Sequence, residues 1–445
     1  MDTKIVVVGT GYVGLVAAVC FARKYNVVCV DTDERKVENI NSGKAPFFEP
    51  ELDDLLTAVH NDKRISATTN LSEAMHDADF VFISVGTPSL HSGAIDLSFV
   101  ESAAADIGAV LRKINKYVIV IQRSTVVPTT TSKLVQATIE RKSGKTAGVD
   151  FGIAFVPEFL REGSAVDDFI NPDRVVIGTQ DKKVKKALFN LYSKFHEELP
   201  SEKIISMSIE SAELVKYASN AFLATKISFA NEIATLAEVV PGVDVNEVMA
   251  GVGLDHRINP RYFQAGAGFG GSCFPKDLNA LVHFSRTHAI EPIMLEAVLE
   301  RNRRQVLHIV DIAENALVSL ADKKIAILGL SFKPNTSDMR EAPSVKVISE
   351  LIERGAGTIV GCDPVAIPEA QKIFGDRILY EMNPQQAIKG ADCAIALTEW
   401  QQFLTLSPED FLNSMRLPIL IDARRIFKSE IFEKRMKYIA IGRGA

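Results

Sequence analysis

Short runs of apolar, mostly β-branched residues recur along the chain and alternate with segments long enough to form helices. The first such runs are KIVVVG, VVCVD, FVFISVG, YVIVIQRST, FGIAFVPE and RVVIG. Continuous apolar strands bounded by glycine or polar turns are what a parallel sheet requires when helices cover both of its faces. The pattern therefore predicts a doubly wound α/β domain over residues 1–199.

A different pattern begins near Ser208. Residues 208–240 are rich in Ala, Glu, Leu and Lys and contain neither Gly nor Pro, which predicts one long helix. Its charged side chains argue against a membrane span. A helix of this length is typical of a spine between domains or of a dimer contact, and we expect it to open a central helical domain over residues 200–315.

Strand-like runs return near Asp322, with KKIAILGLSF, TIVGCD, CAIALTEW, LPILIDARR and YIAIG. They predict a second α/β sheet within residues 316–445. The expected fold class is therefore α/β, with two doubly wound domains joined by the long central helix and a helical middle domain.

Composition excludes several classes of function. The net charge of −6 provides no basic field for nucleic acid or for an anionic membrane. The first apolar run is too short for a signal peptide or a membrane span, so neither export nor membrane insertion is expected. The five cysteines and eight histidines are scattered without paired spacing, which indicates no metal site, no disulfide framework and a reducing, cytoplasmic compartment.

Gly9, Gly11 and Gly14 have the spacing G-x-G-x-x-G between the first predicted strand and an Ala-rich helix. Gly9 permits a tight turn, Gly11 lets a pyrophosphate approach the backbone, and Gly14 allows close packing of helix on strand. The next strand ends in Asp31, whose carboxylate can bind both ribose hydroxyls and would repel a 2′-phosphate. The turn therefore predicts a Rossmann-like site for NAD rather than NADP, where Lys36 could reach the ribose or a phosphate.

Two hydroxyl groups follow later strands of the same domain. Thr87 lies in SVGTP and Thr125 in QRSTVVP. Ligands of open α/β sheets sit beyond the carboxyl ends of the strands, where these hydroxyls could meet the nicotinamide half of the cofactor. Both residues could equally be ordinary turn residues.

A cysteine stands in the glycine-rich stretch GAGFGGSCFPKD, residues 266–277. The other four cysteines fall inside predicted helices or strands, as small buried residues do. Around Cys273 the glycines leave the backbone room to fold against a ligand, and Lys276 and Asp277 follow within one turn. A nearby cation favours a thiolate, which is the nucleophilic form.

Further reactive groups accompany this thiol. Lys216 and Asn220 are four residues apart on the predicted spine helix and so share one face, where together they could hold a developing oxyanion. Glu158 and Glu162 follow a strand, where they could act as acids or merely begin a helix. A thiol, a lysine and carboxylates beside a dinucleotide site indicate oxidation of an alcohol through an aldehyde, because an aldehyde can lose a hydride only after a nucleophile has added to it.

With these motifs the chain resembles the UDP-glucose/GDP-mannose dehydrogenase family. The motifs GTGYVGL, SVGTP, PEFLREGSA, ELVKYASNAFLA, GFGGSCFPKD, ILGLSFKPNTSDMREAPS and DARR occur in the order of that family and cover nearly the whole chain. The resemblance implies an NAD-dependent enzyme that oxidises UDP-glucose twice, to UDP-glucuronate, through a thiohemiacetal and a thioester on cysteine. It also implies a homodimer or a higher homo-oligomer, and a nucleotide-sugar site in the last domain, whose first turn lacks the G-x-G-x-x-G spacing.

The resemblance implies roles for the matching positions. Cys273 corresponds to the nucleophile, Lys216 and Asn220 to the groups that hold the reacting oxygen, and Glu158 to an acid–base group. Asp277, with Thr125 beside a water, completes the catalytic set as the partner in proton transfer and hydrolysis. The positions expected to bind the cofactor are Gly9, Gly11, Tyr12, Val13, Gly14, Asp31, Lys36, Thr87, Thr125, Glu162, Lys276 and Arg340. Those expected to bind the substrate are Glu158, Phe159, Leu160, Arg161, Glu162, Lys216, Asn220, Arg257, Tyr262, Phe263, Gln264, Ala265, Gly266, Gly270, Lys333, Arg424 and Arg425; the motif does not decide between the last two, and Arg257 reaches the neighbouring subunit's substrate in family members.

Two positions depart from the pattern typical of the UDP-glucose branch. Val156 stands where the family usually has Asn, and Pro128 comes one position later than usual. GDP-mannose or another nucleotide sugar therefore remains an alternative substrate. More distant alternatives are a single-step hydroxyacid dehydrogenase, which needs no thiol, and an NAD-sensing protein without catalysis.

Overall fold

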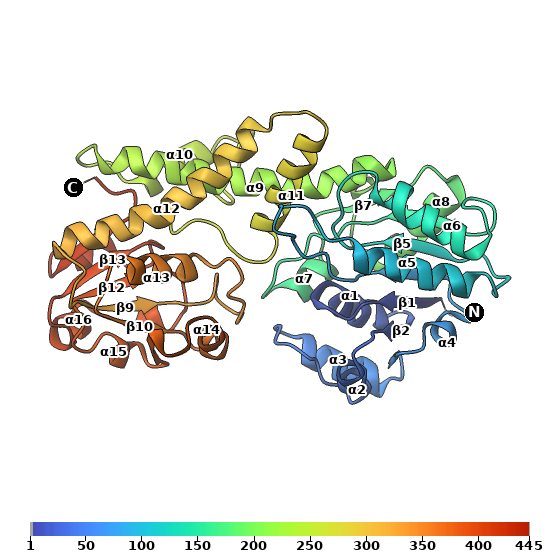
Figure 1. Cartoon of the computed structure of the whole chain (residues 1–445), viewed down its shortest axis with the longest axis horizontal. Helices are drawn as coiled ribbons and strands as arrows, with labels where there is room; N and C mark the ends of the chain where they lie inside the picture. Colours follow the sequence, from blue (N-terminus) through green and yellow to red (C-terminus); the bar gives the residue numbers. More distant parts are fainter. Residues whose placement is uncertain (1–2, 445) are drawn as a thin grey trace. The chain divides into compact units, whose positions relative to one another are not determined.

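The structure, a computed structural model, describes residues 3–444 as two compact units whose boundary falls between Ser219 and Asn220 (Figure 1). The long helix α9, Ile209–Glu238, crosses this boundary without a break. It confirms the helix predicted from residues 208–240. Each unit is described below by itself.

The first unit is built on an eight-stranded sheet in the order β3-β2-β1-β4-β5-β6-β7-β8. Neighbouring strands pair in parallel, except that β6 and β7 are antiparallel through Phe155 and Gly178. This one antiparallel pair is a departure from the parallel sheet that the apolar runs predict. The strands are β1 (Lys4–Val8), β2 (Asn26–Val30), β3 (Ile65–Thr68), β4 (Phe80–Ile83), β5 (Ile119–Gln122), β6 (Gly152–Phe155), β7 (Val175–Gly178) and β8 (Ile204–Met207).

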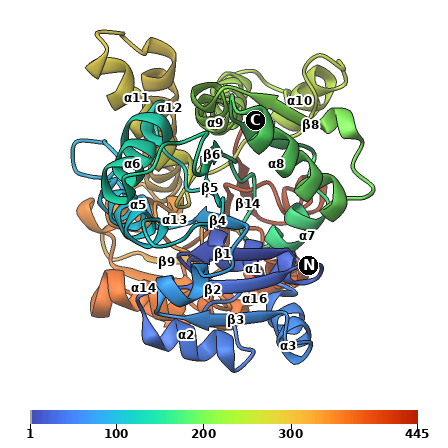
Figure 2. The same ribbon diagram turned by 90° about the vertical axis from the view of Figure 1, so that its right-hand side faces the viewer.

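Helices cover both faces of this sheet (Figure 2). Alternate residues of β1 point into different apolar clusters: Ile5 and Val7 pack with α1, α3 and α8, whereas Val6 and Val8 pack with α4, α5 and α6. The sheet is therefore buried on both sides, as its continuous apolar runs predict. The helices are α1 (Tyr12–Ala22), α2 (Glu34–Asn41), α3 (Leu52–Asn61), α4 (Leu71–Met75), α5 (Ser98–Leu111), α6 (Ala137–Ser143), α7 (Ala165–Ile170) and α8 (Lys182–Phe195).

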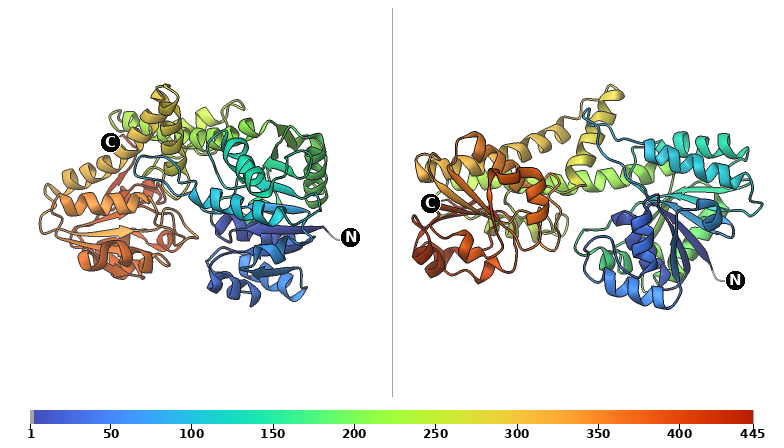
Figure 3. Two further views of the ribbon diagram at one scale, coloured as in Figure 1. Left: turned by 45° about the vertical axis from the view of Figure 1, so that its right-hand side comes forward. Right: turned by 60° about the horizontal axis from the view of Figure 1, so that its bottom comes forward.

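The second unit combines a helical part with a six-stranded parallel sheet in the order β11-β10-β9-β12-β13-β14. The helical part consists of the rest of α9 with α10 (Val245–Gly253), α11 (Phe274–Thr287) and α12 (Ile293–Leu317). Side chains of α9, α12 and α13 share one apolar cluster with β9 and β13, and α12 runs along this face of the sheet (Figure 3). The sheet and its helices are β9 (Lys324–Leu328), α13 (Pro343–Glu353), β10 (Thr358–Cys362), α14 (Ile367–Phe374), β11 (Leu379–Glu381), α15 (Pro384–Ala387), β12 (Cys393–Ala396), α16 (Pro408–Ser414), β13 (Ile419–Asp422), α17 (Ser429–Phe432) and β14 (Lys437–Ala440).

Three strands were not anticipated, and each lies at the edge of a sheet. β3 and β8 close the two ends of the first sheet, and β11 closes one end of the second. Their residues are only partly buried: β3, with the sequence ISAT, alternates between buried and more exposed positions. An edge strand needs no continuous apolar run, so the pattern that identifies the central strands does not mark it.

A buried histidine makes the stability of the first unit depend on pH. His196 follows α8 and is 6% exposed; its Nδ1 lies 3.2 Å from the carbonyl oxygen of Ile170, and its ring meets Phe195 edge-on. Burial lowers its pKa from 6.5 to about 4. Since the folded-state pKa lies below the unfolded one, the neutral imidazole stabilises the fold above pH 6.5, and this contribution is lost as the pH falls towards 4.

We therefore expect His196→Gln to flatten the pH dependence of the unfolding free energy. Between about pH 7.5 and about pH 5 the wild type should lose about 2 kcal/mol more than the variant. Urea denaturation followed by circular dichroism at both pH values measures the difference. His91→Gln, at an exposed position, serves as the control, and an equal pH dependence in His196→Gln and the wild type would contradict the argument.

Candidate active site

The turn between β1 and α1 has the geometry of a dinucleotide site. Gly9 has a φ of +93°, and a Cβ placed there would lie 2.8 Å from the carbonyl oxygen of Ser84. A Cβ on Gly14 would lie 1.9 Å from the carbonyl oxygen of Gly9, whereas one on Gly11 would meet no atom within 4 Å. Gly11 is the N-cap of α1 and provides no side-chain cap, so the N–H groups at the start of this helix can receive a phosphate.

The carboxylate of Asp31 lies beside this turn. Its Oδ2 accepts hydrogen bonds from the backbone N–H of Thr10 at 2.8 Å and from the Thr10 hydroxyl at 2.6 Å, and the Lys36 ammonium is 3.5 Å away. Burial raises the pKa of Asp31, but the hydrogen bonds from Thr10 and from the backbone outweigh it, so the pKa lies below its usual value. Asp31 is thus an ionised acceptor at the end of β2, where a ribose is bound in this fold.

Glu158 and Lys216 form a buried ion pair in the first unit. Lys216 Nζ lies 3.0 Å from Glu158 Oε1, and the two side chains are 5% and 6% exposed. Burial raises the pKa of Glu158, but the Lys216 charge and a hydrogen bond from the Leu160 N–H outweigh it and hold the pKa below its usual value. The pair brings together two predicted catalytic residues, one from the loop after β6 and one from α9.

The loop that carries the predicted nucleophile of the second unit leads into α11. Cys273 is the N-cap of this helix and is exposed, with its Sγ 3.6 Å from the Ser272 hydroxyl. The positive end of a helix dipole stabilises an anion at that position. In the first turn of the helix, the N–H of Asp277 donates to the Cys273 carbonyl at 2.8 Å.

Asp277 is the centre of a polar cluster. It is 1% exposed, and its Oδ1 lies 2.6 Å from Lys276 Nζ while its Oδ2 accepts from Asn220 Nδ2 at 2.6 Å. The structure thus brings together three residues that the sequence places in the catalytic or cofactor set. Lys216 and Asn220 lie one turn apart on α9, as their spacing predicts.

Side-chain amides hold the backbone of the glycine-rich loop between α10 and α11. Asn231 Oδ1 accepts from the N–H of Gly266 at 2.8 Å, and Gln305 Nε2 donates to the Gly266 carbonyl at 2.7 Å. Asn302 binds both backbone groups of Phe269, at 2.8 and 2.9 Å. These three amides, from α9 and α12, fix the segment that the sequence assigns to the nucleotide sugar.

The preceding part of the same loop carries Arg257 and Tyr262. Arg257 is exposed and its Nε donates to Asp255 at 3.0 Å, while Tyr262 has a φ of +66°. Lys226 of α9 donates to the carbonyl oxygens of Ile258 at 3.3 Å and of Asn259 at 2.8 Å, which anchors the loop to the helix.

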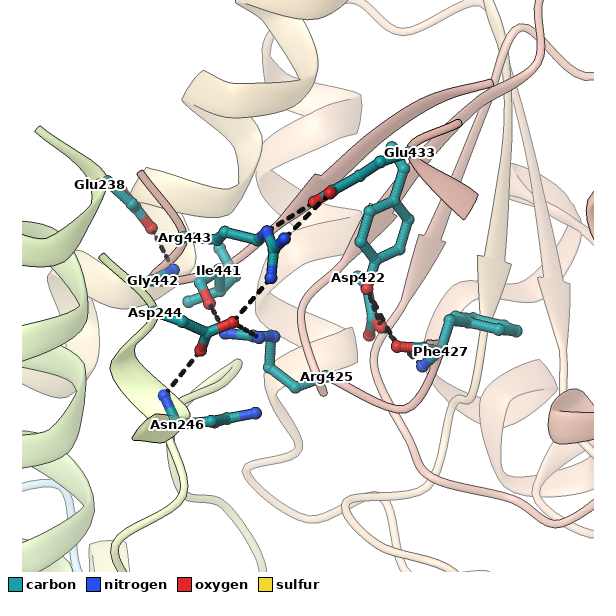
Figure 4. Close-up of polar contacts among 11 residues, drawn as sticks. Glu238, Asp244, Asn246, Asp422, Arg425, Phe427, Glu433, Ile441, Gly442 and Arg443 are labelled. Atoms are coloured by element: carbon teal, nitrogen blue, oxygen red, sulfur yellow. Dashed lines mark hydrogen bonds and ion pairs between the residues drawn. The ribbon is translucent and has the colours of Figure 1, made fainter. Parts of the chain in front are cut away.

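The two adjacent arginines after β13 have different surroundings. Arg424 Nε donates to the Leu397 carbonyl at 2.7 Å and its Nη2 to the Phe332 carbonyl at 3.1 Å, next to Lys333. Arg425 turns away: its Nη2 lies 2.7 Å from Asp244 and its Nη1 donates to the Ile441 carbonyl at 3.0 Å, in a network that includes Arg443 and Glu433 (Figure 4). The structure therefore separates two positions that the motif left equivalent.

The remaining predicted site residues lie in loops or at helix ends. Thr87 and Thr125, both partly buried, follow β4 and β5, and Tyr12 and Val13 open α1. Other predicted positions follow Glu158 before α7, lie between α10 and α11, or precede α13; they are Phe159, Leu160, Arg161, Glu162, Phe263, Gln264, Ala265, Gly270 and Arg340.

Two buried acids near these residues were not anticipated. Glu49 accepts hydrogen bonds from the Tyr12 hydroxyl and, at 2.7 Å each, from the N–H groups of Gly163 and Ala165, so it joins the glycine turn to the loop of Glu162.

Glu213 accepts from the N–H groups of Thr129 at 2.7 Å and Thr131 at 2.8 Å, in the segment that follows Thr125. Burial raises the pKa of Glu213 to about 7. In the sequence, each of these acids is marked only by a carboxylate among apolar neighbours. Many surface residues have the same pattern, so it does not identify a buried acid.

Neither a metal-ligand cluster nor a membrane-spanning helix occurs among residues 3–444. Within that range no group of three or more His, Cys, Asp or Glu side chains could hold a metal ion. No helix within the same residues is both long and apolar enough to cross a membrane.

A glycine turn with an ionised acid after β2 is typical of a dinucleotide-dependent dehydrogenase, and the exposed Cys273 at a helix N-terminus stands where the sequence predicts a nucleophile. Comparison with known families agrees with this class. Residues 3–196 match the NAD-binding domain of the UDP-glucose/GDP-mannose dehydrogenase family, residues 210–304 its central domain, and residues 326–429 its UDP-binding domain.

Relatives match the chain over nearly its whole length. UDP-glucose 6-dehydrogenase TuaD of Bacillus subtilis is 41% identical, over 99% of this chain and 94% of the relative. UDP-glucose 6-dehydrogenase AglM of Haloferax volcanii is 40% identical, over 94% and 96%. The structure of a UDP-glucose dehydrogenase from Pyrobaculum islandicum superimposes with a TM-score of 0.91 at 38% identity, covering 100% of this chain and 98% of the other.

The chain belongs to the UDP-glucose/GDP-mannose dehydrogenase family. The predictions of the family, of the α/β fold class with two Rossmann-like sheets, of an oxidoreductase and of NAD as its cofactor are confirmed. The glycine turn and Asp31 fit that cofactor: they leave space for the pyrophosphate at Gly11 and present an ionised acceptor for the ribose.

Proposed function

We propose that the protein oxidises UDP-glucose to UDP-glucuronate through two successive oxidations at C6. The observation that carries the proposal is the exposed Cys273 at the N-terminus of α11, with the buried Asp277 in the next turn. A single-step dehydrogenase needs no such thiol. Relatives named UDP-glucose 6-dehydrogenases, about 40% identical over almost the whole chain, support UDP-glucose as the sugar.

The chain's own residues account for the chemistry apart from the hydride acceptor. NAD, when bound, accepts a hydride in each oxidation. The Cys273 sulfur adds to the carbonyl carbon of the intermediate aldehyde and forms a thiohemiacetal. Because this carbon carries a hydroxyl and a hydrogen, it can lose the second hydride. The thioester that results is then cleaved by water, which restores the thiol and releases the carboxylate.

Polar side chains are assigned to assist these steps. We assign Lys216 and Asn220, on one face of α9, to stabilising the oxygen while it carries negative charge. We assign Asp277 to receiving a proton from the attacking water, and Glu158 to acid–base work beside its ion-pair partner Lys216. The bonds Glu158–Lys216 and Asn220–Asp277 support these roles, because each fixes the direction of a reactive group.

The nucleotide of the sugar is assigned to the second sheet. Lys333, after β9, and Arg424, after β13, follow the carboxyl ends of two strands of one parallel sheet that have β12 between them, and ligands of this fold bind beyond such ends. Arg424 also contacts the Phe332 carbonyl, next to Lys333. We therefore propose Arg424 as the substrate contact and Arg425 as a structural residue.

Two variants separate these roles. Arg424→Gln should raise the KM for UDP-glucose by about tenfold, because a charge-assisted hydrogen bond to the substrate is lost, and should cost only about 1–2 kcal/mol of stability for its two bonds to backbone carbonyls. Arg425→Gln should instead destabilise the fold, by about 3 kcal/mol, because it leaves Asp244 without one of its two arginine partners. Steady-state kinetics and urea denaturation of both variants decide the assignment, and a KM effect confined to Arg425→Gln would reverse it.

We propose that the protein works as a homodimer or a higher homo-oligomer, with α9 in the interface. Phe222, Phe229 and Leu236 are 66%, 47% and 59% exposed and recur every seven residues on this helix. An apolar stripe of this kind is typical of a helix that packs against a partner. The exposed Arg257 would then be available to the neighbouring subunit, as the family resemblance implies.

Replacing Phe229 by aspartate should shift the protein towards the monomer, because a charge in an apolar interface is left without a partner. Light scattering after size-exclusion chromatography reports the mass directly. Val149→Asp, at a position in the first unit that is 72% exposed, is the control. A dimer that survives in Phe229→Asp at low protein concentration would rule out this stripe as the interface.

We also place the reaction in the cytoplasm, since the nucleophile must remain a reduced thiol.

The identity of the substrate is tested by comparing kcat/KM for UDP-glucose and GDP-mannose with saturating NAD. UDP-glucose should be preferred by about a hundredfold or more, since the wrong base leaves polar groups of the site unpaired. A preference for GDP-mannose would overturn the choice of sugar and leave the family unchanged.

A further inference from the structure

The two sheets begin with the same turn. Gly9, after β1, and Gly329, after β9, have φ values of +93° and +105°. The N–H of Gly9 donates to the Val30 carbonyl at 2.8 Å, and the N–H of Gly329 donates to the Cys362 carbonyl at the same distance. Since each second strand is followed directly by an aspartate, Asp363 occupies in the second unit the position that Asp31 occupies in the first.

The two aspartates differ in what surrounds them. The side chain of Asp31 is 10% exposed, and three of its four polar contacts come from Thr10 and Lys36. Asp363 is completely buried. Its Oδ1 accepts from the N–H groups of Val365 and Ala366 at 3.0 and 2.9 Å.

The other oxygen of Asp363 is bound to the turn after β9. Oδ2 accepts from the N–H of Leu330 at 2.9 Å and from the N–H and the hydroxyl of Ser331, each at 3.0 Å. A fourth hydrogen bond to Oδ2, at 3.0 Å, comes from Nε1 of Trp400. Both oxygens are therefore engaged, and the carboxylate that corresponds to the predicted ribose acceptor of the first unit is bound by an indole N–H in the second.

Trp400 lies in the segment after β12, next to β9 in the sheet. It is 8% exposed, and besides Asp363 its Nε1 reaches the Ser331 hydroxyl at 3.1 Å. Thr398, two residues earlier, donates its hydroxyl to the Ser331 carbonyl at 2.5 Å. The turn of residues 330–333 is thus held from one side by Asp363 and from the other by Thr398 and Trp400, and it ends at Lys333.

We infer that Trp400 is a positioning residue for the nucleotide of the substrate: its indole N–H, bound to Asp363 and Ser331, fixes the turn of residues 330–333 so that Lys333 meets the diphosphate. The inference rests on the proposed nucleotide-sugar site. Without the N–H, Asp363 Oδ2 keeps only donors from the turn itself, and of the two side chains after β12 that hold the turn Thr398 alone remains. Part of the substrate's binding energy would then be needed to order the Lys333 side chain, so the substrate would bind more weakly.

The variant that tests this is Trp400→Phe, which keeps an aromatic ring in the buried position and removes the donor. We expect the KM for UDP-glucose to rise about fivefold to twentyfold, because part of the binding energy is then needed to order the turn, while kcat and the KM for NAD stay within about twofold. The matched control is Tyr380→Phe, which removes a hydroxyl that donates to the Gly375 carbonyl at 2.8 Å in the same sheet. A merely structural loss would lower kcat through the fraction of folded enzyme and would leave KM unchanged.

Binding of UDP alone, measured by calorimetry without NAD, separates this inference from the proposed reaction. Weaker UDP binding by Trp400→Phe, with faster hydrogen exchange in residues 330–333, supports the positioning role even if the sugar proves to be a different one. Equal UDP affinity in the wild type and in Trp400→Phe overturns it. If Trp400→Phe does not fold, Ser331→Ala removes the hydroxyl that Trp400 and Asp363 share and carries the same expectation.

Discussion

Replacing Cys273 by alanine is expected to abolish the production of UDP-glucuronate, with turnover reduced by about four orders of magnitude or more. The reason is chemical: without the sulfur, the intermediate aldehyde has no hydroxyl-bearing carbon from which a second hydride can leave. Binding of NAD should not change, because Cys273 is not among the positions expected to bind the cofactor. Mass spectrometry of the products and calorimetry with NAD measure the two effects.

The other cysteines provide the control. Burial raises the pKa of each of their thiols to about 12, so they supply almost no thiolate near neutral pH; they are Cys20, Cys29, Cys362 and Cys393. Cys393→Ala should therefore keep its activity, and a small alkylating reagent should label Cys273 first in the folded protein. Full activity of Cys273→Ala would show that Cys273 is not the nucleophile.

Replacing Lys216 by methionine is expected to have two large effects. Loss of the ammonium removes charge stabilisation from the reacting oxygen, which should lower kcat about a hundredfold to a thousandfold. It also leaves the Glu158 carboxylate, 6% exposed, without its cation at 3.0 Å, which should cost about 3–5 kcal/mol of stability. Steady-state kinetics and urea denaturation measure the two effects separately.

The double variant Lys216→Met, Glu158→Gln distinguishes catalysis from stability. Removing both charges leaves no buried ion without a partner, so most of the lost stability should return. Activity should stay low, since the group that faces the oxygen is still absent. Recovery of activity together with stability would show that Lys216 matters only for the fold.

The central strands and the long helix could be predicted from the sequence because each leaves a local signal. The apolar runs of β1, β2 and β4 are buried on both faces, and α9 runs without Gly or Pro for 30 residues. The edge strands β3, β8 and β11 leave no such signal, because one side of each needs no partner strand. The antiparallel pairing of β6 with β7 depends on how the chain returns to the sheet, which no local pattern records.

In the candidate site, too, the sequence predicts groupings of residues that are close along the chain and misses contacts between residues that are far apart. Cys273, Lys276 and Asp277 stand together in the sequence, and Lys216 and Asn220 are one helical turn apart, so local spacing identifies both sets. By contrast, the pair of Glu158 and Lys216 joins residues 58 positions apart.

Contacts of this long-range kind also decide between residues that are adjacent in the sequence. Arg424 and Arg425 are equivalent in a motif, and only the ion pair of Arg425 with Asp244, 181 positions away, separates them. The supporting role of Trp400 depends likewise on Asp363, 37 positions away.

If each sugar is oxidised twice before release, the stoichiometry of NADH formed from limiting UDP-glucose with excess NAD will show it. We expect two molecules of NADH for each UDP-glucose consumed, with UDP-glucuronate as the only product. One NADH per sugar, with an aldehyde as the product, would contradict the thioester route and favour a single-step dehydrogenase. Absence of NADH with any nucleotide sugar would contradict the enzyme itself and favour an NAD-sensing protein.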